Sequence, residues 1–377
     1  MVAGEASGDL LGAHLIAALK ARRPELSFAG IGGPRMIEQG FESLFPMERL
    51  AVRGYAEVLG HYREIMAMRG KLAERLLAER PALFIGIDSS DFNLALERRL
   101  KEAGIPAVQY VSPSVWAWRG WRIRRIARSV THLLALYPFE PAIYAKAGVP
   151  VTYVGHPLAD VIPLETDKND ARVQLRVPPG SRVVALLPGS RRSELHYMAD
   201  LFVQTARRML QDAPDVHFVC PTASRATREL FEAALHRHRA TELPLTLLFG
   251  HSHEALAAAD VALVASGTAT LETALIKTPM VITYRQSPVT WALMRWMLYL
   301  PYIGLPNILA GEAIVPEFIQ DRAIPGRLSE ALLALLQDPV AQLRQTERFR
   351  AIHLALRQNA AEKAADAVLG VLDAARA

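Results

Sequence analysis

The chain has 377 residues, too many for one ordinary domain of ~150 residues, which indicates two domains. Hydrophobic residues make up 51% and charged residues 21%, which excludes an intrinsically disordered chain. The net charge of +5 does not by itself indicate nucleic-acid binding, and the single cysteine, Cys220, excludes a disulfide framework and a cysteine-rich metal site.

Short apolar runs alternate with longer helical patterns along the chain. Continuous apolar strands separated by helices are typical of a parallel sheet with helices on both faces, so the sequence predicts an α/β fold. A short first strand at Val2 and Ala3 precedes a helical pattern over Leu10–Leu19, and further helices are expected over Tyr62–Glu79 and Asp200–Gln211. The remaining predicted strands are Phe28–Ile31, Leu83–Ile87, Ala107–Val111, Leu133–Ala135, Thr152–Val154, Val183–Leu187, His217–Val219, Leu245–Leu248, Val261–Ala265 and Met280–Thr283.

The polar segment Pro157–Gly180 interrupts this pattern and is the predicted seam between two halves. We therefore expect one domain over residues 1–160 and a second over 161–345, followed by a helical, alanine-rich tail over 346–377. Glu5 and Asp9 fall where a signal peptide needs an apolar core, and no window reaches about 18 uninterrupted apolar residues. The protein is therefore expected to be cytoplasmic, and either soluble or peripheral to a membrane.

Two corners of one kind, in which small residues end a buried strand just before a helix, lie in different halves. Such corners expose backbone N–H groups and the positive end of the helix dipole, so they suit an anion such as a phosphate. A turn with a helix cap at Ser7, Asp9 or Ser190 is the alternative. Two such corners suggest two Rossmann-like domains that face one ligand. The first corner contains Gly4, Glu5 and Ser7, and the second contains Gly189, Ser190 and Arg191.

The run Asp88-Ser89-Ser90-Asp91 follows the predicted strand Leu83–Ile87, which places Asp88 at the carboxyl end of that strand. In open α/β sheets this edge faces the ligand crevice, and a carboxylate there can accept a proton from an attacking hydroxyl. The alternative is that Asp88 or Asp91 caps the helix beginning near Asn93. Because only one of the two is needed as a cap, we favour a functional role for Asp88.

Arg191 lies beside the N-terminus of a predicted helix, where its guanidinium and the backbone amides would hold a diphosphate. A plain surface arginine is the alternative. A third corner, Ser266-Gly267-Thr268, follows the strand Val261–Ala265 and opens a helix that contains Glu272. Small residues let this helix approach a phosphate or a ribose, whose hydroxyls Glu272 could bind; a simple capping pattern is the alternative.

Aromatic and basic residues gather in one segment. Such residues together serve nucleic acids, phosphorylated lipids or membrane surfaces. Because no RNA-binding signature accompanies them, we favour the last two and expect no nucleic-acid partner; a solvated basic helix beside core tryptophans is the alternative. The residues are Trp116, Trp118 and Trp121 with Arg119, Arg122, Arg124, Arg125 and Arg128.

Two apolar segments could meet a lipid. Trp291–Leu300 is too short to span a bilayer and forms either a core helix or an interfacial one, and Val58–Met66 is a weaker segment of this kind. The histidines show no metal-ligand spacing and no Asp-x-Asp pair is visible, so no metal or cofactor is expected.

These motifs, in this order, resemble those of the lipid-A-disaccharide synthases. The string Val111–Trp118 is highly specific, whereas a lone Gly-x-x-Ser-Gly would not be. The match extends over essentially the whole chain. The matching segments are Val2–Asp9, Gly86–Asn93, Tyr110–Arg119, Val154–Pro157, Leu186–Arg191, Ala265–Glu272 and Leu305–Gly311.

The resemblance implies an inverting GT-B glycosyltransferase that uses no metal. Such an enzyme joins UDP-2,3-diacylglucosamine to 2,3-diacylglucosamine 1-phosphate, forms a β-1,6 disaccharide and releases UDP. The family's catalytic aspartate falls on Asp88, its arginine on Arg191 and its helix glutamate on Glu272, and Asn307 lies in the matching Leu-Pro-Asn segment. The resemblance also implies a homodimer with exchanged C-terminal parts, peripheral on the inner face of the inner membrane; packing of the tail on its own N-terminal domain is the alternative.

Two rival functions remain at this point. A UDP-GlcNAc 2-epimerase would share the two-domain fold but need no lipid acceptor, and the apolar segments argue weakly against it. A non-catalytic UDP-sugar or lipid-binding protein would keep the phosphate corners but have no use for Asp88 at a strand end.

Overall fold

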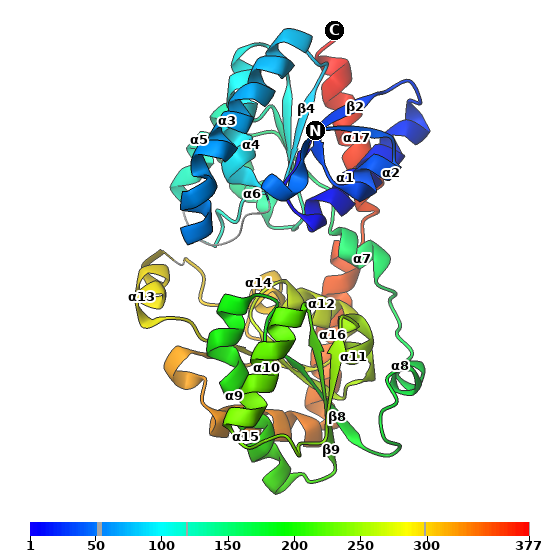
Figure 1. The fold of residues 1–377 in the computed structure, drawn as a ribbon. Helices are drawn as coiled ribbons and strands as arrows, with labels where there is room; N and C mark the ends of the chain where they lie inside the picture. Colours follow the sequence, from blue (N-terminus) through cyan, green and yellow to red (C-terminus); the bar gives the residue numbers. More distant parts are fainter. Residues whose placement is uncertain (51–54, 118–119, 298, 377) are drawn as a thin grey trace. The chain divides into compact units, whose positions relative to one another are not determined.

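The computed structural model describes residues 1–50, 55–117, 120–297 and 299–376 (Figure 1). The chain forms two compact units. Unit 1 comprises Met1–Asp160 together with Leu356–Ala377, and unit 2 comprises Val161–Ala355. The first crossing between the units thus falls at the predicted seam, and the return to unit 1 falls later than residue 346, where the sequence predicts the tail to begin.

Unit 1 is built on a parallel sheet of seven strands in the order β3-β2-β1-β4-β5-β6-β7. The chain adds strands outward from β1 in one direction and then from β4 in the other, so the strand order reverses between β1 and β4. The strands are β1 (Val2–Ala3), β2 (Phe28–Gly32), β3 (Phe41–Pro46), β4 (Phe84–Ile87), β5 (Ala107–Tyr110), β6 (His132–Ala135) and β7 (Val151–Tyr153).

Helices cover both faces of this sheet, with α1 and α17 on one face and α3 and α4 on the other (Figure 1). The C-terminal α17 completes the core beside α1, since Ala364, Ala365 and Val368 are buried in one cluster with Leu15 and Ile16 of α1. The helices are α1 (Ala6–Arg22), α2 (Pro34–Glu38), α3 (Tyr55–Glu79), α4 (Ser90–Glu102), α5 (Ile123–Ser129), α6 (Glu140–Ala145), α7 (Pro157–Val161) and α17 (Ala360–Ala374).

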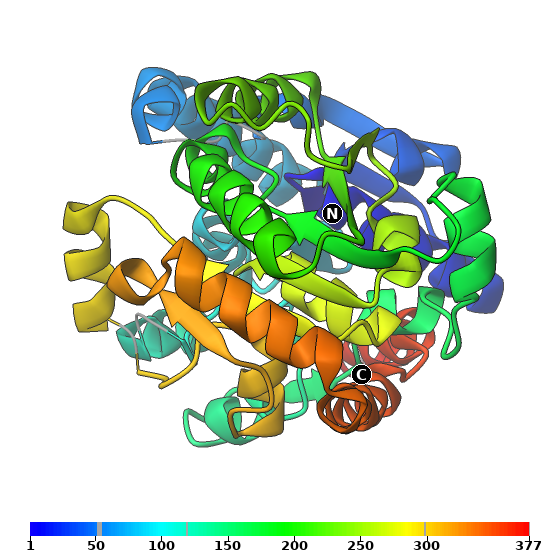
Figure 2. The ribbon, with the colours of Figure 1, turned by 90° about the horizontal axis from the view of Figure 1, so that it is seen from below.

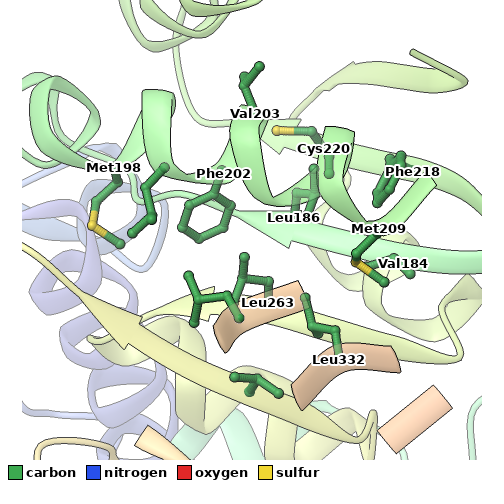
Figure 3. Close-up of a cluster of buried hydrophobic side chains, with 14 of the residues drawn as sticks. Val184, Leu186, Met198, Phe202, Val203, Met209, Phe218, Cys220, Leu263 and Leu332 are labelled. Carbon is green, nitrogen blue, oxygen red and sulfur yellow. The ribbon is translucent and has the colours of Figure 1, made fainter. Parts of the chain in front are cut away.

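Unit 2 is built on a parallel sheet of six strands in the order β10-β9-β8-β11-β12-β13, which reverses between β8 and β11. Apolar side chains of β8, β9 and β11 interlock with those of α9 and α15 to form its core (Figure 3). The strands are β8 (Arg182–Leu187), β9 (Val216–Thr222), β10 (Leu245–Phe249), β11 (Val261–Ala265), β12 (Met280–Tyr284) and β13 (Glu317–Ile319).

Helices α9 and α15 pack side by side over one face of the second sheet (Figure 2). The long α9 has a largely apolar inner face, on which Met198, Phe202 and Met209 are fully buried. The helices are α8 (Lys168–Gln174), α9 (Arg192–Asp212), α10 (Arg225–Arg237), α11 (Ser252–Ala258), α12 (Thr268–Ile276), α13 (Pro288–Met297), α14 (Leu305–Ala310), α15 (Pro325–Gln337) and α16 (Pro339–Leu356).

The predicted α/β fold with parallel sheets and helices on both faces is confirmed. Every predicted strand is present; Val2–Ala3 and Val261–Ala265 have the predicted bounds, and the other strands have shifted ends. The structure adds β3 and β13, which both lie at a sheet edge. Edge strands are half exposed and lack the continuous apolar run by which central strands are recognised. The prediction was also wrong at Val111, which follows β5 with a left-handed φ of +77° instead of extending the strand.

Candidate active site

The predicted corners and the Asp88 turn follow the carboxyl ends of four central strands, which form two neighbouring pairs: β1 with β4 and β8 with β11. Ligands of open α/β sheets bind at the carboxyl ends of the strands where the strand order reverses. In unit 1 the Gly4 corner follows β1 and Asp88 follows its neighbour β4. In unit 2 the Gly189 corner follows β8 and the Gly267 corner follows its neighbour β11. The topology therefore gives each unit one site, built from two segments far apart in the sequence.

The backbone at Asp88 adopts a left-handed conformation, with φ of +53° at Asp88 and +35° at Ser89. Two side-chain amides hold this turn, because Gln109 Nε2 donates to the Asp88 carbonyl at 3.0 Å and Asn93 Nδ2 donates to it at 3.1 Å. Residues with a Cβ adopt such conformations at a cost and cluster at functional sites. Helix α4 begins at Ser90, and the side chain of its N-cap residue, Ser89, makes no capping hydrogen bond.

Asp88 opens onto a cavity of about 240 Å³. Arg122 also lines it; this side chain is buried and forms an ion pair with Asp91. The cavity therefore gathers two carboxylates, one arginine and several hydroxyl groups around one space, which suits a hydroxylated ligand. Its lining residues are Asp88, Ser90, Asp91, Val111, Ser112, Pro113, Ser114, Val115 and Arg122.

The Gly4 corner packs closely against the Asp88 turn, a structural role that the sequence did not predict. A Cβ at residue 4 would lie 2.2 Å from Ser89 Oγ, so the glycine lets the β1 corner approach the Asp88 turn. The expectation that Asp9 caps its own helix is wrong, because its buried carboxylate accepts N–H groups of Gly33 and Met36 at the start of α2. Helix α1 begins after Glu5 with no side-chain cap, so Ser7 does not cap it either.

Unit 2 contains a cavity of about 470 Å³, within the range of small-molecule sites. Corners after β8 and β11 form it together with the ends of β9 and α11. It gathers six of the residues that the sequence singled out in this half, which are Gly189, Ser190, Arg191, Gly267, Thr268 and Glu272.

The amides at the Gly189 corner are already occupied by Glu194. Its Oε2 accepts the N–H groups of Ser190 at 3.0 Å and Arg191 at 3.2 Å, so Ser190 is not the cap that the sequence suggested. The Arg191 side chain is 61% exposed and lies 3.4 Å from Glu194 Oε1. Across the cavity, α12 starts at Thr268 with no side-chain cap, which leaves first-turn N–H groups available to an anion. The groups of this cavity that could bind an anion are therefore the Arg191 guanidinium and the start of α12.

Glu272 has a partner that sequence reasoning missed. His253 Nε2 lies 3.5 Å from Glu272 Oε2, and the hydrogen bond with this carboxylate raises the pKa of His253 despite its partial burial. No signal in the sequence joins residues of α11 and α12, since neither metal-ligand spacing nor a motif includes His253.

Asn307 does not belong to this cavity, and the expectation that it contacts the substrate does not fit the structure. Its side chain is fully buried and its amide donates to Val315 O and Glu317 Oε1, both at 2.8 Å. Its Oδ1 accepts N–H groups of Ile314 and Val315. With every hydrogen-bonding group engaged, Asn307 stabilises the segment that leads into β13.

The aromatic and basic segment is only partly described, because Trp118 and Arg119 lie outside the described residues. Trp116 is half-buried; it packs edge-on against Tyr137 and Phe139 and donates its indole N–H to Glu140 at 3.1 Å. Trp121 is exposed. Arg124, Arg125 and Arg128 of α5 are exposed as well.

The apolar segments give one clear surface feature. In α13 Trp296 is 93% exposed, and Tyr299 just beyond the helix is also exposed. Val58 and Leu59 belong to α3, but their side chains lie outside the described residues. Within the described part of the chain, no helix is long and apolar enough to cross a membrane. The same residues contain no group of three or more His, Cys, Asp or Glu side chains placed to hold a metal ion.

Comparison with known proteins connects these sites to one family. The model of a family described as lipid-A-disaccharide synthetase matches residues 1–371. The lipid-A-disaccharide synthase of Azoarcus sp. (strain BH72) is 58% identical over 372 residues, which cover 99% of this chain and 95% of that protein. The synthase of Thiobacillus denitrificans (strain ATCC 25259 / T1) is 52% identical over 376 residues, which cover 100% of both. The resemblance carried by the motifs is thus confirmed.

Solved structures share the fold at much lower identity. The UDP-GlcNAc 2-epimerase from Neisseria meningitidis, solved with bound UDP-GlcNAc, has a TM-score of 0.62 at 12% identity, covering 98% of each chain. The glycotransferase of kitacinnamycin has a TM-score of 0.62 at 16% identity, covering 97% of each chain. At these identities the likeness concerns the fold alone, and it confirms the predicted GT-B architecture.

Proposed function

Because the chain belongs to the lipid-A-disaccharide synthetase family, we propose that it condenses UDP-2,3-diacylglucosamine with 2,3-diacylglucosamine 1-phosphate. The protein is a UDP-sugar-dependent glycosyltransferase of lipid A biosynthesis. The products are the β-1,6-linked disaccharide 1-phosphate and UDP. The observation that carries this assignment is the family match over residues 1–371. This range includes both sites at the strand ends, the one at Gly4 and Asp88 and the one at Gly189 and Gly267.

The donor UDP occupies the cavity of unit 2. The Arg191 guanidinium and the start of α12 near Gly267 and Thr268 bind its diphosphate, and Glu272 binds ribose hydroxyls. The positive charge and the aligned N–H groups stabilise the negative charge that develops on UDP as it leaves. These groups supply that stabilisation without a metal ion.

The acceptor reacts at Asp88 of unit 1. The carboxylate takes the proton from the acceptor's 6-hydroxyl while the hydroxyl oxygen forms the new bond to the anomeric carbon of the donor sugar. The bond from that carbon to the diphosphate breaks on the opposite side, so the configuration inverts. Arg122, which lines the same cavity, binds the acceptor's 1-phosphate.

The acyl chains of both substrates require an apolar environment. A peripheral position on the inner face of the inner membrane would provide it. Exposed Trp296 and Tyr299 and the exposed arginines of α5 support this position. The functional form is a homodimer. In this structure the C-terminal α17 packs on α1 of its own chain, which agrees with the alternative to an exchanged tail.

Release of UDP from UDP-2,3-diacylglucosamine, with and without acceptor, in detergent and EDTA, tests the function. Acceptor-dependent release that EDTA leaves unchanged is the expected result. Release without acceptor would point to hydrolysis or to an epimerase-like reaction, and no release by a folded sample that binds UDP would point to a binding protein.

A further inference from the structure

A cluster of buried polar side chains lies directly beneath the Asp88 turn, and the proposed reaction does not use it. Asn93 and Glu97 reach it from α4, and Gln109 reaches it from β5; all three are fully buried. Glu97 and Gln109 converge above Gly86 of β4. A Cβ on that glycine would lie 2.3 Å from Glu97 Oε1 and 2.8 Å from Gln109 Oε1.

The amide of Gln109 can point in only one direction. Its Nε2 faces three backbone carbonyls, those of Asp88 at 3.0 Å, Tyr110 at 3.3 Å and Val111 at 3.2 Å. Carbonyl oxygens only accept hydrogen bonds, so the NH2 group must face them. Oε1 then points away from these carbonyls, toward the space above Gly86 where Glu97 Oε1 also lies. Two of these carbonyls belong to the left-handed residues Asp88 and Val111, which line the cavity, and the third belongs to Tyr110 at the end of β5.

The oxygens of this cluster lack a donor. Among the described residues, Gln109 Oε1, Asn93 Oδ1 and both carboxyl oxygens of Glu97 accept no hydrogen bond. A buried acceptor without a donor costs about 1–3 kcal/mol, and a buried unpaired carboxylate costs more. Two acceptors that face each other are satisfied when one of them carries a proton.

We propose that Glu97 is a positioning residue for Asp88, whose protonated carboxyl donates its O–H to Gln109 Oε1 and thereby holds the Gln109 amide against the Asp88 turn. Burial supports this state, since it raises the pKa of Glu97 to about 8 and no charged neighbour contributes to the shift. Glu97 touches no substrate in this arrangement; it acts through Gln109 on the backbone that carries the base. The inference rests on the proposed role of Asp88.

Substitutions of Glu97 distinguish a protonated side chain that donates a hydrogen bond from a charged carboxylate. Glu97→Gln supplies an N–H donor of the same shape, whereas Glu97→Leu supplies none. We expect Glu97→Leu to lower kcat about 10- to 100-fold through a misplaced base, and Glu97→Gln to stay within about threefold of the wild type. The affinity for UDP, which binds to unit 2, is expected to stay unchanged in both. Glu102→Leu, on the exposed face of α4, is the matched control.

Infrared spectroscopy tests the proton directly. The wild type minus Glu97→Gln difference spectrum is expected to contain the C=O stretch of a protonated carboxyl group. Absence of this band overturns the proposal, even if Glu97→Leu fails to fold. Equal loss of kcat in Glu97→Gln and a folded Glu97→Leu, or wild-type kcat in Glu97→Leu, also overturns it. If Asp88→Asn keeps wild-type turnover, the proposed function of Asp88 fails, while the infrared band still reports the state of Glu97.

Discussion

Asp88 and Ser89 hold left-handed conformations that cost of order 1–3 kcal/mol each in residues with a Cβ. Hydrogen bonds from Asn93 and Gln109 to the Asp88 carbonyl offset that cost. The turn lifts Asp88 out of the sheet edge and into the cavity, whereas an extended residue at this place would continue the strand. The strain is therefore consistent with a base that must point at a substrate.

Asp88→Asn is expected to lower turnover by about 100- to 10,000-fold, because the amide cannot accept the acceptor's proton. Titration calorimetry with UDP is expected to give the wild-type affinity, since UDP binds in the other unit. Asp91→Asn is the matched control, because its carboxylate is already paired with Arg122. A smaller loss of turnover in Asp88→Asn than in Asp91→Asn would contradict the assignment of the base to Asp88.

Arg191 is exposed and only loosely paired with Glu194, so its guanidinium can turn toward a diphosphate at little cost. Glu194 already satisfies the amides of its corner. The side chain of Arg191 is therefore the principal cation on this side of the cavity.

Arg191→Ala is expected to weaken UDP binding about 10- to 100-fold, the range for losing a hydrogen bond to a charged group. Arg191→Lys should recover only part of it, because a lysine cannot bind two phosphate oxygens with a planar fork. The neighbouring Arg192, exposed but outside the cavity lining, provides the control variant Arg192→Ala. Unchanged UDP affinity in Arg191→Ala, measured by calorimetry, would contradict the assignment.

At the scale of elements, α13 differs from the other helices of unit 2. Core helices such as α9 direct their apolar side chains into the sheet, whereas Trp296 of α13 is almost completely exposed. A large aromatic side chain in water is unfavourable by its apolar area, and the interface of a membrane accommodates tryptophan and tyrosine well.

The double variant Trp296→Ser, Tyr299→Ser is therefore expected to bind liposomes of anionic lipids less strongly than the wild type. Flotation of the protein with the vesicles measures this. Phe249→Ser removes a comparably exposed aromatic ring from β10 and is expected to leave flotation unchanged. Equal flotation of the wild type and both variants would contradict a contact between α13 and the membrane.

At the scale of the whole molecule, the two ends of the chain depend on each other. Helix α17 buries Val368 against α1 within unit 1, so the first helix and the last share one core. Ion pairs of Arg22 with Glu362 and of Arg23 with Asp373 lie at the surface of this contact. Burial of apolar side chains, and not these exposed pairs, provides most of its stability.

Val368→Asp is expected to lower the stability of unit 1 by at least about 3 kcal/mol, because it buries a carboxylate without a partner. Asp373→Ala should cost at most about 1 kcal/mol. Scanning calorimetry measures both, and UDP binding checks that unit 2 remains folded. Equal melting of the two variants would mean that α17 does not pack on α1 in solution.

The sequence by itself determined the α/β class, the central strands, the three corners at Gly4, Gly189 and Gly267, and the turn at Asp88. These follow from local signals: apolar runs of strand length, small residues at their ends, and helical periodicity after them. Asp88, Arg191 and Gly267 were recognisable because each follows such an end, and Glu272 because it lies in the helix that begins there. The motifs in their order also identified the family, which the comparisons confirm.

Only the tertiary structure decided which corners meet and which polar groups remain available. Strand order pairs β1 with β4 and β8 with β11, and pairing between distant strands leaves no local trace in the sequence. Contacts across elements likewise engaged Asp9 and Asn307 inside the protein and gathered Asn93, Glu97 and Gln109 beneath Asp88. A hydrogen bond depends on distance in space, and residues far apart in the chain reach that distance only after the sheet and its helices have packed.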